Sequence, residues 1–510
     1  MMREKKKSVA KSALSVTLIT FGIKFLGLIK QTVLAAYCGA NIETDAFFVA
    51  TGLIANMCTV MFSSISVSLL SIHTDTLIHD GRNDSNKIIN GVLRIFSPIS
   101  VIIAVFFCFG SKYVAKFMAP SYSGVELVTL SNYIKMMSVL IVMWCYFTTI
   151  NVILETDKEF FPGKLQGLFQ NSFLIFSAIV LYPRYGVASL IYAFLFSGLV
   201  QCILVTFCVR SRFRFLLGSI GKKREIKQLL RLMVPLLVGN AIYEINDIVD
   251  KQISTGLGAG NASYLTYGST INEIVTGVII ASVSTVLFAH FASWIVSGEV
   301  TKVEENLKKT IKYLYVIILP IMVMCLFAGD HIIGILYGRG SFGTEEIMST
   351  YGVAAGYATG FIFQAIRANV VKVYYAFQDT KIPMINGAMA VALNIILSFL
   401  LSKFIGIGGI SLATSISMFV VTVLLMNKLK LYLSNFSLRE LIPETIKGAI
   451  AFVIASICVL LIKDMRQSIL LSFLIEGTAC VIVYILVLFF LKSECLCEIV
   501  DIFSHRKKKG

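Results

Sequence analysis

Long apolar runs, separated by short polar segments, follow one another along the whole chain. A membrane helix needs about 20 mainly apolar residues, and about fourteen runs of that kind can be read from the sequence. They predict an all-α polytopic membrane protein with about 14 transmembrane helices. The predicted spans are 10–36, 45–72, 90–110, 128–153, 163–182, 186–209, 228–253, 263–294, 309–327, 347–373, 383–402, 407–427, 444–463 and 468–491.

Composition supports the same class of protein. Of the 510 residues, 57% are hydrophobic and 15% are charged, and the mean hydropathy is +0.82. A soluble globular protein would have a charged fraction near about 25%, so that class is excluded. The bilayer is therefore the expected solvent of this chain.

The net charge of +16 indicates orientation rather than a nucleic-acid partner. The two termini and the alternate loops between them carry roughly 28 Lys and Arg, against about 7 in the opposite set of loops. The densest basic segment is 210–227. Positively charged loops stay on the cytoplasmic side, so both termini are predicted to be cytoplasmic. Attraction of an anionic lipid substrate is a second interpretation of the basic segment.

An internal repeat is visible at an offset near 220 residues. Lys30 and Gln31 recur as Lys251 and Gln252, and residues 158–162 before the fifth span resemble 379–383 before the eleventh. Copies that lie six spans apart share an orientation, which is the plan of transporters built from two parallel halves. We therefore expect two parallel six-helix repeats: an N-lobe at 1–215, a C-lobe at 216–430, and a C-terminal helix pair with a basic tail at 431–510.

Polar side chains form stripes on the first two helices of each repeat. Such residues are costly in a membrane and tend to face a cavity, so the stripes predict a central hydrophilic cavity. Its candidate substrate-binding residues are Lys24, Lys30, Gln31, Asn56, Lys251, Thr270 and Glu273, and the candidate ion-coupling residues are Glu244, Asp247 and Asp250. Arg367 and Lys372 on the tenth span and Glu476 on the fourteenth are weaker candidates.

Purely structural interpretations of these residues are also available. Lys30 and Lys251 lie near helix ends, where a long amine can reach the interface without a ligand. Glu244, Asp247 and Lys251 can neutralise one another as a structural network. Lys24 and Lys30 point about 120° apart on an ideal helix, so both face one cavity only if the helix bends at Gly22 or Gly27.

No motif of an enzyme is present. The sequence contains no P-loop, no metal-spaced His pair and no Gly-x-Ser-x-Gly segment, and its eleven Cys are scattered. We therefore predict no catalytic residue, no metal site and no cofactor. A membrane carrier of this kind needs an outside source of energy, either the membrane potential or a gradient of Na⁺ or H⁺.

Several segments resemble the lipid II flippase MurJ family, within the superfamily of multidrug, oligosaccharidyl-lipid and polysaccharide exporters. The run Phe25–Ala50 (FLGLIKQTVLAAYCGANIETDAFFVA) is similar to the family's start, and Leu336–Phe342 (LYGRGSF) and Tyr374–Pro383 (YYAFQDTKIP) are further matches. The resemblance covers essentially the whole chain. By position, Lys24 and Lys30 match family arginines, Asp45 matches the Asp of the TDAFF motif, and Lys251 matches the basic residue after the Val-Asp pair. The resemblance thereby adds Asp45 to the candidate substrate-binding residues.

The resemblance implies a flippase that moves an undecaprenyl-pyrophosphate-linked sugar across the bacterial cytoplasmic membrane by alternating access. It implies basic cavity residues that hold the pyrophosphate, and a groove at the C-terminal helix pair for the lipid tail. The implied partners are the lipid-linked substrate, membrane lipids and the machinery of cell-wall or polysaccharide synthesis, with no nucleic acid.

Four residues depart from the family pattern. Gln31 stands where an Asp often follows the second arginine, Cys58 and Thr59 replace a common Arg pair, and Thr270 replaces an Arg. A capsular, teichoic or exopolysaccharide precursor on the same carrier is therefore an alternative substrate. A cation-coupled multidrug and toxin extruder is an alternative function, and a membrane glycosyltransferase or polymerase is a third.

Overall fold

The fold is helical throughout the part of the chain that can be described. A computed structural model describes residues 2–215, 223–433, 436–463, 468–496 and 498, and no strand occurs among them. Among these described residues, thirteen helical segments are long and apolar enough to cross a membrane. The prediction of an all-α membrane protein is confirmed. The basic tail after residue 498 and residues 216–222 of the basic segment lie outside the described residues.

The predicted span 347–373 is the one that the count of thirteen omits. It is divided into α16 (Thr344–Ala358) and α17 (Phe361–Ala376), which have 15 and 16 residues and are each too short to cross the hydrocarbon core alone. The division falls where Gly360 meets α19: a Cβ added there would lie 2.8 Å from the Cα of Ser415. With this divided helix, the described chain is consistent with the expected number of about 14 spans.

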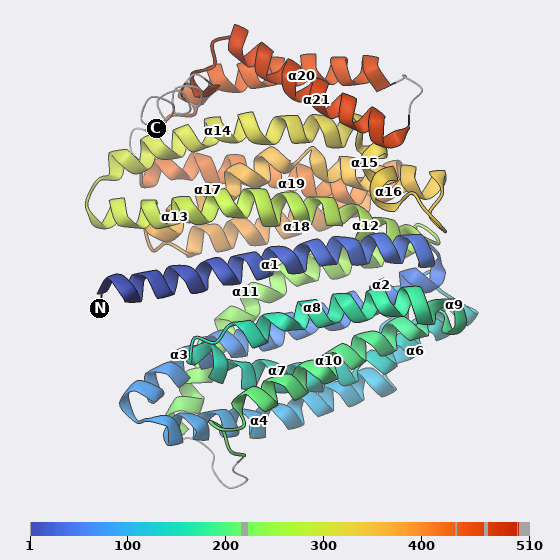
Figure 1. Cartoon of the computed structure of the whole chain (residues 1–510), viewed down its shortest axis with the longest axis vertical. Helices are drawn as coiled ribbons and strands as arrows, with labels where there is room; N and C mark the ends of the chain where they lie inside the picture. Colours follow the sequence, from blue (N-terminus) through green and yellow to red (C-terminus); the bar gives the residue numbers. More distant parts are fainter. Residues whose placement is uncertain (1, 216–222, 434–435, 464–467, 497, 499–510) are drawn as a thin grey trace. The chain divides into compact units, whose positions relative to one another are not determined.

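The chain forms two compact units, and the first is Met1–Ser263. Within it, α8 and α10 lie side by side, and α4 packs along α7 (Figure 1). The elements of unit 1 are α1 (Met2–Cys38), α2 (Ile42–Cys58), the π-helix η1 (Thr59–Ser63), α3 (Ser64–His79), α4 (Arg82–Phe109), α5 (Ser111–Met118), α6 (Gly124–Met137), α7 (Val139–Thr156), α8 (Phe161–Phe176), the π-helix η2 (Ser177–Leu181), α9 (Tyr182–Tyr185), α10 (Ala188–Val209) and α11 (Lys223–Gly256).

The second unit is Tyr264–Gly510, and α12 (Asn261–Ile274) crosses the boundary. In unit 2 the C-terminal helices α20 and α21 pack against each other and against α14 (Figure 1). Besides α16 and α17, its elements are the π-helix η3 (Val275–Ile280), α13 (Ala281–Val296), α14 (Val300–Phe327), α15 (Gly329–Tyr337), α18 (Lys381–Ile405), α19 (Ile407–Lys428), the 3₁₀ helices η4 (Leu429–Leu431) and η5 (Leu438–Leu441), α20 (Ile442–Lys463) and α21 (Ile469–Phe490).

Backbone geometry at matching turns supports the predicted duplication. Lys158 after α7 and Gln378 after α17 both have positive φ, 64° and 61°, although neither is glycine. At each turn the residue that follows donates its N–H to a carbonyl five residues back, from Glu159 to Leu154 and from Asp379 to Tyr374. The predicted lobe boundaries at residues 215 and 430 rest on sequence correspondence and stay a prediction.

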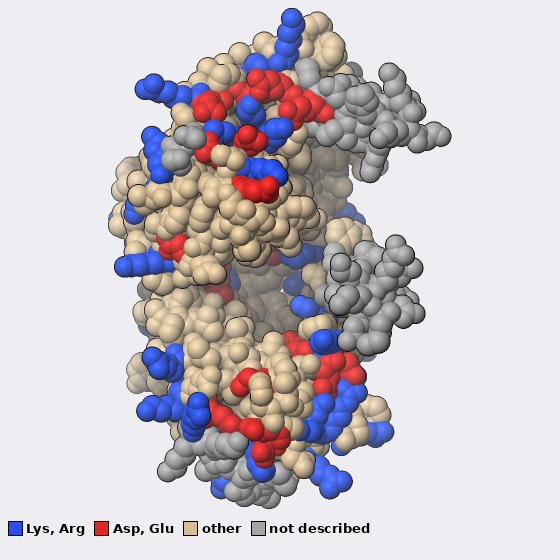
Figure 2. All heavy atoms as spheres, turned by 90° about the vertical axis from the view of Figure 1, so that its left-hand side faces the viewer, with Lys and Arg blue, Asp and Glu red and all other residues tan. Residues whose placement is uncertain are grey.

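An ion-pair cluster holds three loops together at one end of unit 1. Asp157 accepts hydrogen bonds from Arg82 and Arg212, at 2.7 Å and 3.1 Å, and Arg212 also contacts Glu159 at 2.7 Å. Partial burial of Asp157 raises the pKa of its carboxyl, but the two guanidinium groups outweigh this and lower that pKa below its usual value. Figure 2 looks onto the helix ends on the left of Figure 1 and shows acidic and basic side chains lying next to one another there.

Candidate functional site

A polar contact network lies on α11 and α2, where the predicted stripes of spans 7 and 2 meet. Lys251 donates to the Oδ2 atom of Asp247 at 2.8 Å, one helical turn away, and the amide of Asn56 donates to the same oxygen. The Lys251 side chain is 14% exposed and that of Asp247 is 47% exposed. The structure therefore brings together the predicted residues Asn56, Asp247 and Lys251, and Asp247 neutralises the lysine.

Gly52 provides the space that the Lys251 side chain occupies. A Cβ added to Gly52 would lie 2.0 Å from the Nζ atom of Lys251 and 2.9 Å from its Cε atom. Atoms without a bond between them pack at about 3.5–4.0 Å, so no other residue fits at position 52 while the ammonium stays in place. The absence of a side chain at position 52 therefore gives the Lys251 ammonium of α11 its place against α2.

A second contact between the two helices lies at the π-helix η1. The amide of Asn240 on α11 donates to the hydroxyls of Ser63 and Ser64, each at 3.1 Å. A π-helical turn inserts an extra residue and changes the direction of the side chains after it, which is why such turns are frequent at functional sites. In unit 2, η3 interrupts the predicted eighth span in the same manner.

Asp45 of α2 is buried against the start of α12, where it accepts hydrogen bonds from the backbone. Its two carboxylate oxygens accept hydrogen bonds from the N–H of Gly260 and the N–H of Ser263, each at 2.7 Å, and the Ser263 hydroxyl donates to it at 2.6 Å. Its side chain is 0% exposed. This arrangement ties α2 to the turn between α11 and α12, and it fits a structural part better than direct contact with substrate.

The other acidic candidates of α11 differ in exposure. Asp250 is buried and accepts a hydrogen bond from Asn246 at 3.1 Å. Glu244 is half-buried, one turn before Asp247, and its carboxylate makes no hydrogen bond within the described residues. Of the three predicted ion-coupling residues, Glu244 is thus the carboxylate without a hydrogen-bond partner in that part of the chain.

The basic candidates of α1 lie on one unbroken helix. The α-helix runs through Gly22 and Gly27 without interruption, and Asn171 of α8 reaches the Ile23 carbonyl at 3.3 Å. Lys24 is exposed and has no ion pair or hydrogen bond within the described residues, whereas Lys30 is half-buried. The helix is not broken where the glycines would permit a bend.

The side chain of Gln31 on the same helix carries a buried oxygen, Oε1, with no hydrogen-bond partner among the described residues.

In unit 2, the predicted residues Thr270 and Glu273 lie on α12. Thr270 is buried and donates its hydroxyl to the Thr266 carbonyl at 3.1 Å, whereas Glu273 is exposed. No ligand set for a metal ion, taken as three or more His, Cys, Asp or Glu together, occurs among the described residues.

A basic cavity of about 350 Å³ lies between α13, α17 and α19 of unit 2. Arg367 and Lys372 line it, and neither forms an ion pair within the described residues. Gln364 lines it too, and its buried Nε2 donor has no hydrogen-bond partner in the described part. The sequence pattern indicated these two cations only weakly. Arg367, Lys372 and Gln364 lie on different turns of α17, and they line one cavity only because α13 and α19 enclose them.

The C-terminal helix pair carries a buried carboxylate, the weaker sequence candidate Glu476. Glu476 of α21 is 0% exposed, and its Oε2 atom lies 2.8 Å from Nδ1 of His331 on α15. Lys463 of α20 pairs with Asp330 at 2.8 Å. These two contacts join both C-terminal helices to α15.

Comparison with known proteins identifies the family. The model of the family described as "Lipid II flippase MurJ" matches residues 34–479. This chain belongs to the MurJ family. A relative in Treponema pallidum (strain Nichols), named a probable lipid II flippase MurJ, is 26% identical over 429 residues, which cover 81% of this chain and 80% of the relative. A relative of the same name in Vibrio cholerae is 24% identical over 444 residues.

Solved structures of similar fold agree with the MurJ family. A lipid II flippase MurJ in an inward closed conformation superposes with a TM-score of 0.81 at 21% identity, covering 94% of this chain and 99% of that one. An inward-facing multidrug resistance transporter of the MATE family gives 0.70 at 12% identity, covering 81% of this chain and 95% of that one. At these identities the likeness shows the fold alone.

Proposed function

We propose that the chain is a flippase that moves an undecaprenyl-pyrophosphate-linked cell-wall precursor, such as lipid II, across the cytoplasmic membrane by alternating access. The observation that carries this proposal is the family match over residues 34–479. The charged and amide side chains on predicted spans support it, because a transmembrane segment without a polar ligand rarely contains them.

The pyrophosphate needs cations that no carboxylate already neutralises. Lys251 is paired with Asp247, so a phosphate that approaches it competes with that carboxylate. Lys24, by contrast, has no ion pair within the described residues, and the same holds for Arg367 and Lys372. We therefore assign the first contact with pyrophosphate to Lys24 in unit 1, and a second anionic contact to the basic cavity of unit 2.

Arginine and lysine bind pyrophosphate differently. A guanidinium offers a planar pair of donors to a phosphate, whereas an ammonium acts as a point charge. Lys24 therefore holds the anion with less geometric selectivity than an arginine would. Relaxed selectivity allows precursors of other surface polysaccharides on the same lipid carrier, and they are the alternative outcome of the substrate test below.

The proposed energy source is the membrane potential or a gradient of Na⁺ or H⁺, with both termini in the cytoplasm. Moving one charge across the membrane is worth about 2.3 kcal/mol per 100 mV. Glu244 is the proposed coupling carboxylate, because it is half-buried and lacks a hydrogen bond in the described part of the chain. A reporter fused to the C-terminus tests the orientation: activity of a cytoplasm-specific reporter is expected.

The experiment is replacement of the native flippase by this chain in cells depleted of their own. We expect the wild-type chain to restore growth and to expose lipid II headgroups to an impermeant probe at the outer face. Lys24→Ala should lower that exposure at least tenfold at equal membrane abundance, and Lys24→Arg should keep it. Lys403→Ala is the matched control, because Lys403 is an exposed helical lysine without an ion pair in the described residues.

Two outcomes contradict the proposal. Full headgroup exposure in the Lys24→Ala/Lys30→Ala double variant would refute the phosphate site. The second outcome concerns deletion of the gene from the native host. If a surface polysaccharide is then lost while lipid II exposure is unchanged, the substrate is another lipid-linked precursor.

The second candidate function is a cation-coupled multidrug extruder, favoured by the fold shared with MATE transporters and by Glu244 and Asp247 on α11. It predicts increased drug susceptibility upon deletion. Unchanged susceptibility to cationic dyes and drugs would exclude it.

A further inference from the structure

One face of α17 forms a wall of the basic cavity of unit 2. Gln364, Arg367, Ala368 and Lys372 line the cavity, and residues spaced by three, four and eight positions share one face of an α-helix. Two of these residues are cations, and no Asp or Glu is among the described residues of the lining. The cavity of about 350 Å³ is therefore electropositive.

The two cations are only partly engaged by their neighbours. Arg367 donates from Nε to the Oδ1 atom of Asn386 on α18 at 3.1 Å, and neither of its Nη groups has a partner among the described residues. The Nζ atom of Lys372 lies 5.3 Å from the ring centroid of Phe288 and 5.9 Å from that of Tyr375. Aromatic faces attract a cation without neutralising it. Both positive charges are thus available to an anion.

Two buried polar groups of the same lining lack a hydrogen-bond partner in the described part of the chain. They are the Oγ atom of Ser284, a residue that is 3% exposed, and the Nε2 atom of Gln364. The hydroxyls of Thr276 and Thr285 differ, because each donates to a carbonyl one turn back at 2.7 Å. A buried polar group without a partner costs free energy, and a membrane has little water to offset it. A ligand that accepts from Ser284 and Gln364 removes this cost.

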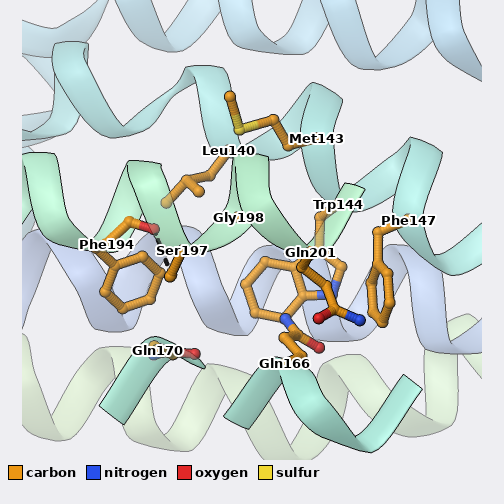
Figure 3. Close-up of a pocket in the computed structure, with 10 residues that line it drawn as sticks. All are labelled: Leu140, Met143, Trp144, Phe147, Gln166, Gln170, Phe194, Ser197, Gly198 and Gln201. Atoms are coloured by element: carbon orange, nitrogen blue, oxygen red, sulfur yellow. Dashed lines mark hydrogen bonds between the residues drawn. The ribbon is translucent and has the colours of Figure 1, made fainter. Parts of the chain in front are cut away.

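A pocket of unit 1 shows that buried amides alone do not form an anion site. It lies between α7, α8 and α10, where Gln166, Gln170 and Gln201 line it (Figure 3). Its cavity measures about 20 Å³, which is room for about one water molecule, and its described lining carries no charge. The buried Oε1 atom of Gln201 is an acceptor without a partner in that part of the chain, and a water molecule satisfies it. The basic cavity differs in volume, in charge and in offering donors.

The predicted orientation places the basic cavity in the cytoplasmic half of the bilayer. With both termini in the cytoplasm, α13 and α17 end on the cytoplasmic side. At a rise of 1.5 Å per residue, Lys372 lies about 6 Å from the end of α17, and Gln364 and Ser284 each lie about 18 Å from the ends of their helices. The hydrocarbon core is about 30 Å thick, so the cavity extends from near the cytoplasmic interface to about the middle of the bilayer.

The spacing of the two cations describes the anion that fits. Arg367 and Lys372 are five residues apart, which separates them by about 7.5 Å along the axis of α17. Charges on successive turns suit an anion with two charged centres better than an anion with one. A diphosphate has one phosphate for each cation, and its other oxygens can accept hydrogen bonds from Ser284 and Gln364. The cavity has room for roughly a dozen water-sized groups, which is more than the heavy atoms of a diphosphate.

We propose that the basic cavity is a diphosphate-binding site of unit 2, in which Arg367 and Lys372 each hold one phosphate and Ser284 and Gln364 donate to the remaining oxygens. This inference rests on the proposed function, because it names the group of the lipid-linked precursor that unit 2 recognises. Soluble pyrophosphate offers the same chemistry, so the experiment separates the two sources.

The test is binding of inorganic pyrophosphate to the purified full chain in nanodiscs, measured by isothermal titration calorimetry at constant ionic strength. All variants carry Lys24→Gln, which removes the other proposed contact with pyrophosphate. We expect saturable binding that Arg367→Gln and Lys372→Gln each weaken at least tenfold, whereas Lys372→Arg keeps it. Inorganic phosphate should bind at least tenfold more weakly than pyrophosphate.

Two further variants separate loss of the site from loss of the fold. Lys403→Gln is the matched control for charge, because Lys403 is an exposed helical lysine without an ion pair in the described residues. It should retain the affinity of the unmodified cavity. Gln364→Leu removes a buried donor that has no partner in that part of the chain, so it should weaken pyrophosphate binding at least threefold without lowering Tm.

Unchanged affinity in Arg367→Gln and Lys372→Gln would overturn the proposal, and so would unchanged affinity in Gln364→Leu or equal affinity for phosphate and pyrophosphate. Undecaprenyl pyrophosphate should displace inorganic pyrophosphate from the cavity. If it does not, the bound diphosphate is a soluble one and the link to the precursor is refuted. The assay does not measure transport, so a chain that binds pyrophosphate here but restores no growth contradicts the proposed function alone.

Discussion

Gly52→Ala tests whether the position of the Lys251 ammonium depends on the missing side chain at position 52. The new Cβ would lie 2.0 Å from Nζ, so Nζ must retreat by about 1.5 Å to reach an ordinary contact distance. Lys251 now lies 2.8 Å from Asp247. If Nζ moves away from Asp247 by that amount, the pair passes beyond the hydrogen-bond range of about 3.2 Å.

The magnitude follows from the exposure of the two partners. A hydrogen bond to a charged group contributes about 1.5–3 kcal/mol. Asp247 is 47% exposed, so solvent screening reduces this value, and we expect Gly52→Ala to destabilise the protein by about 1–2 kcal/mol. In a compact unit of this size, that corresponds to a decrease in Tm of about 2–6 °C.

A double-mutant cycle isolates the cause. Purified variants are unfolded by heat in detergent, and the Tm values of Gly52→Ala, Lys251→Ala and the double variant are compared. If the alanine acts by displacing the lysine, it adds nothing once the lysine is gone, so the double variant should match Lys251→Ala.

Gly239→Ala is the matched control, because a Cβ at Gly239 of α11 has no neighbour within 4 Å. It should be neutral or slightly stabilising through helix propensity. A Gly52→Ala protein as stable as this control, or strictly additive effects in the cycle, would refute the reasoning.

Three further changes have defined outcomes. Asp157→Asn should lower Tm modestly above pH 5 and progressively less below about pH 4. Because Arg82 and Arg212 lower the pKa of Asp157, its carboxylate stabilises the folded state above the unfolded-state pKa of about 3.9, and this stabilisation is lost as pH falls through the folded-state pKa. A Tm difference between variant and wild type that stays constant down to pH 3 would contradict this. Asp45→Ala leaves buried backbone donors unsatisfied at about 1–3 kcal/mol each, so size-exclusion profiles should show a reduced folded fraction, with Asp45→Asn intermediate; a profile equal to wild type would be against it. Gly356→Ala brings a Cβ to 2.9 Å from a backbone oxygen of α19 and should lower stability by about 1–3 kcal/mol in thermal unfolding, whereas Gly352→Ala, with open space around it, should not.

Helical periodicity accounts for the parts of the site that could be predicted. Asp247 and Lys251 are four residues apart on one helix, so their pairing follows from sequence spacing alone. Asn56 is 191 residues from Asp247, and its contact depends on how α2 packs on α11. The space at Gly52 depends on the same packing, and no pattern along the chain reveals it.

The fold shows the same division between local and tertiary causes. Hydropathy located the spans, because the bilayer imposes their length and composition. It did not locate the interruption at Thr359–Gly360, where Ser415 of α19 lies against Gly360 and donates its hydroxyl to the carbonyls of Gly356 and Tyr357. Nor did it indicate Gln364, since a single amide in an apolar run becomes part of a cavity only when α13 and α19 lie beside α17.

The network of Asn56, Asp247 and Lys251 joins α2, which belongs to the predicted N-lobe, to α11, which belongs to the predicted C-lobe. Asp247 and Lys251 lie one turn apart on a single helix, so their ion pair moves with that helix and cancels from the energy difference between the inward-open and outward-open states. The hydrogen bond from Asn56 crosses between the two predicted lobes, so it is lost when those lobes separate at that point. Of the three residues, Asn56 is therefore the one whose contact can bias which way the carrier faces.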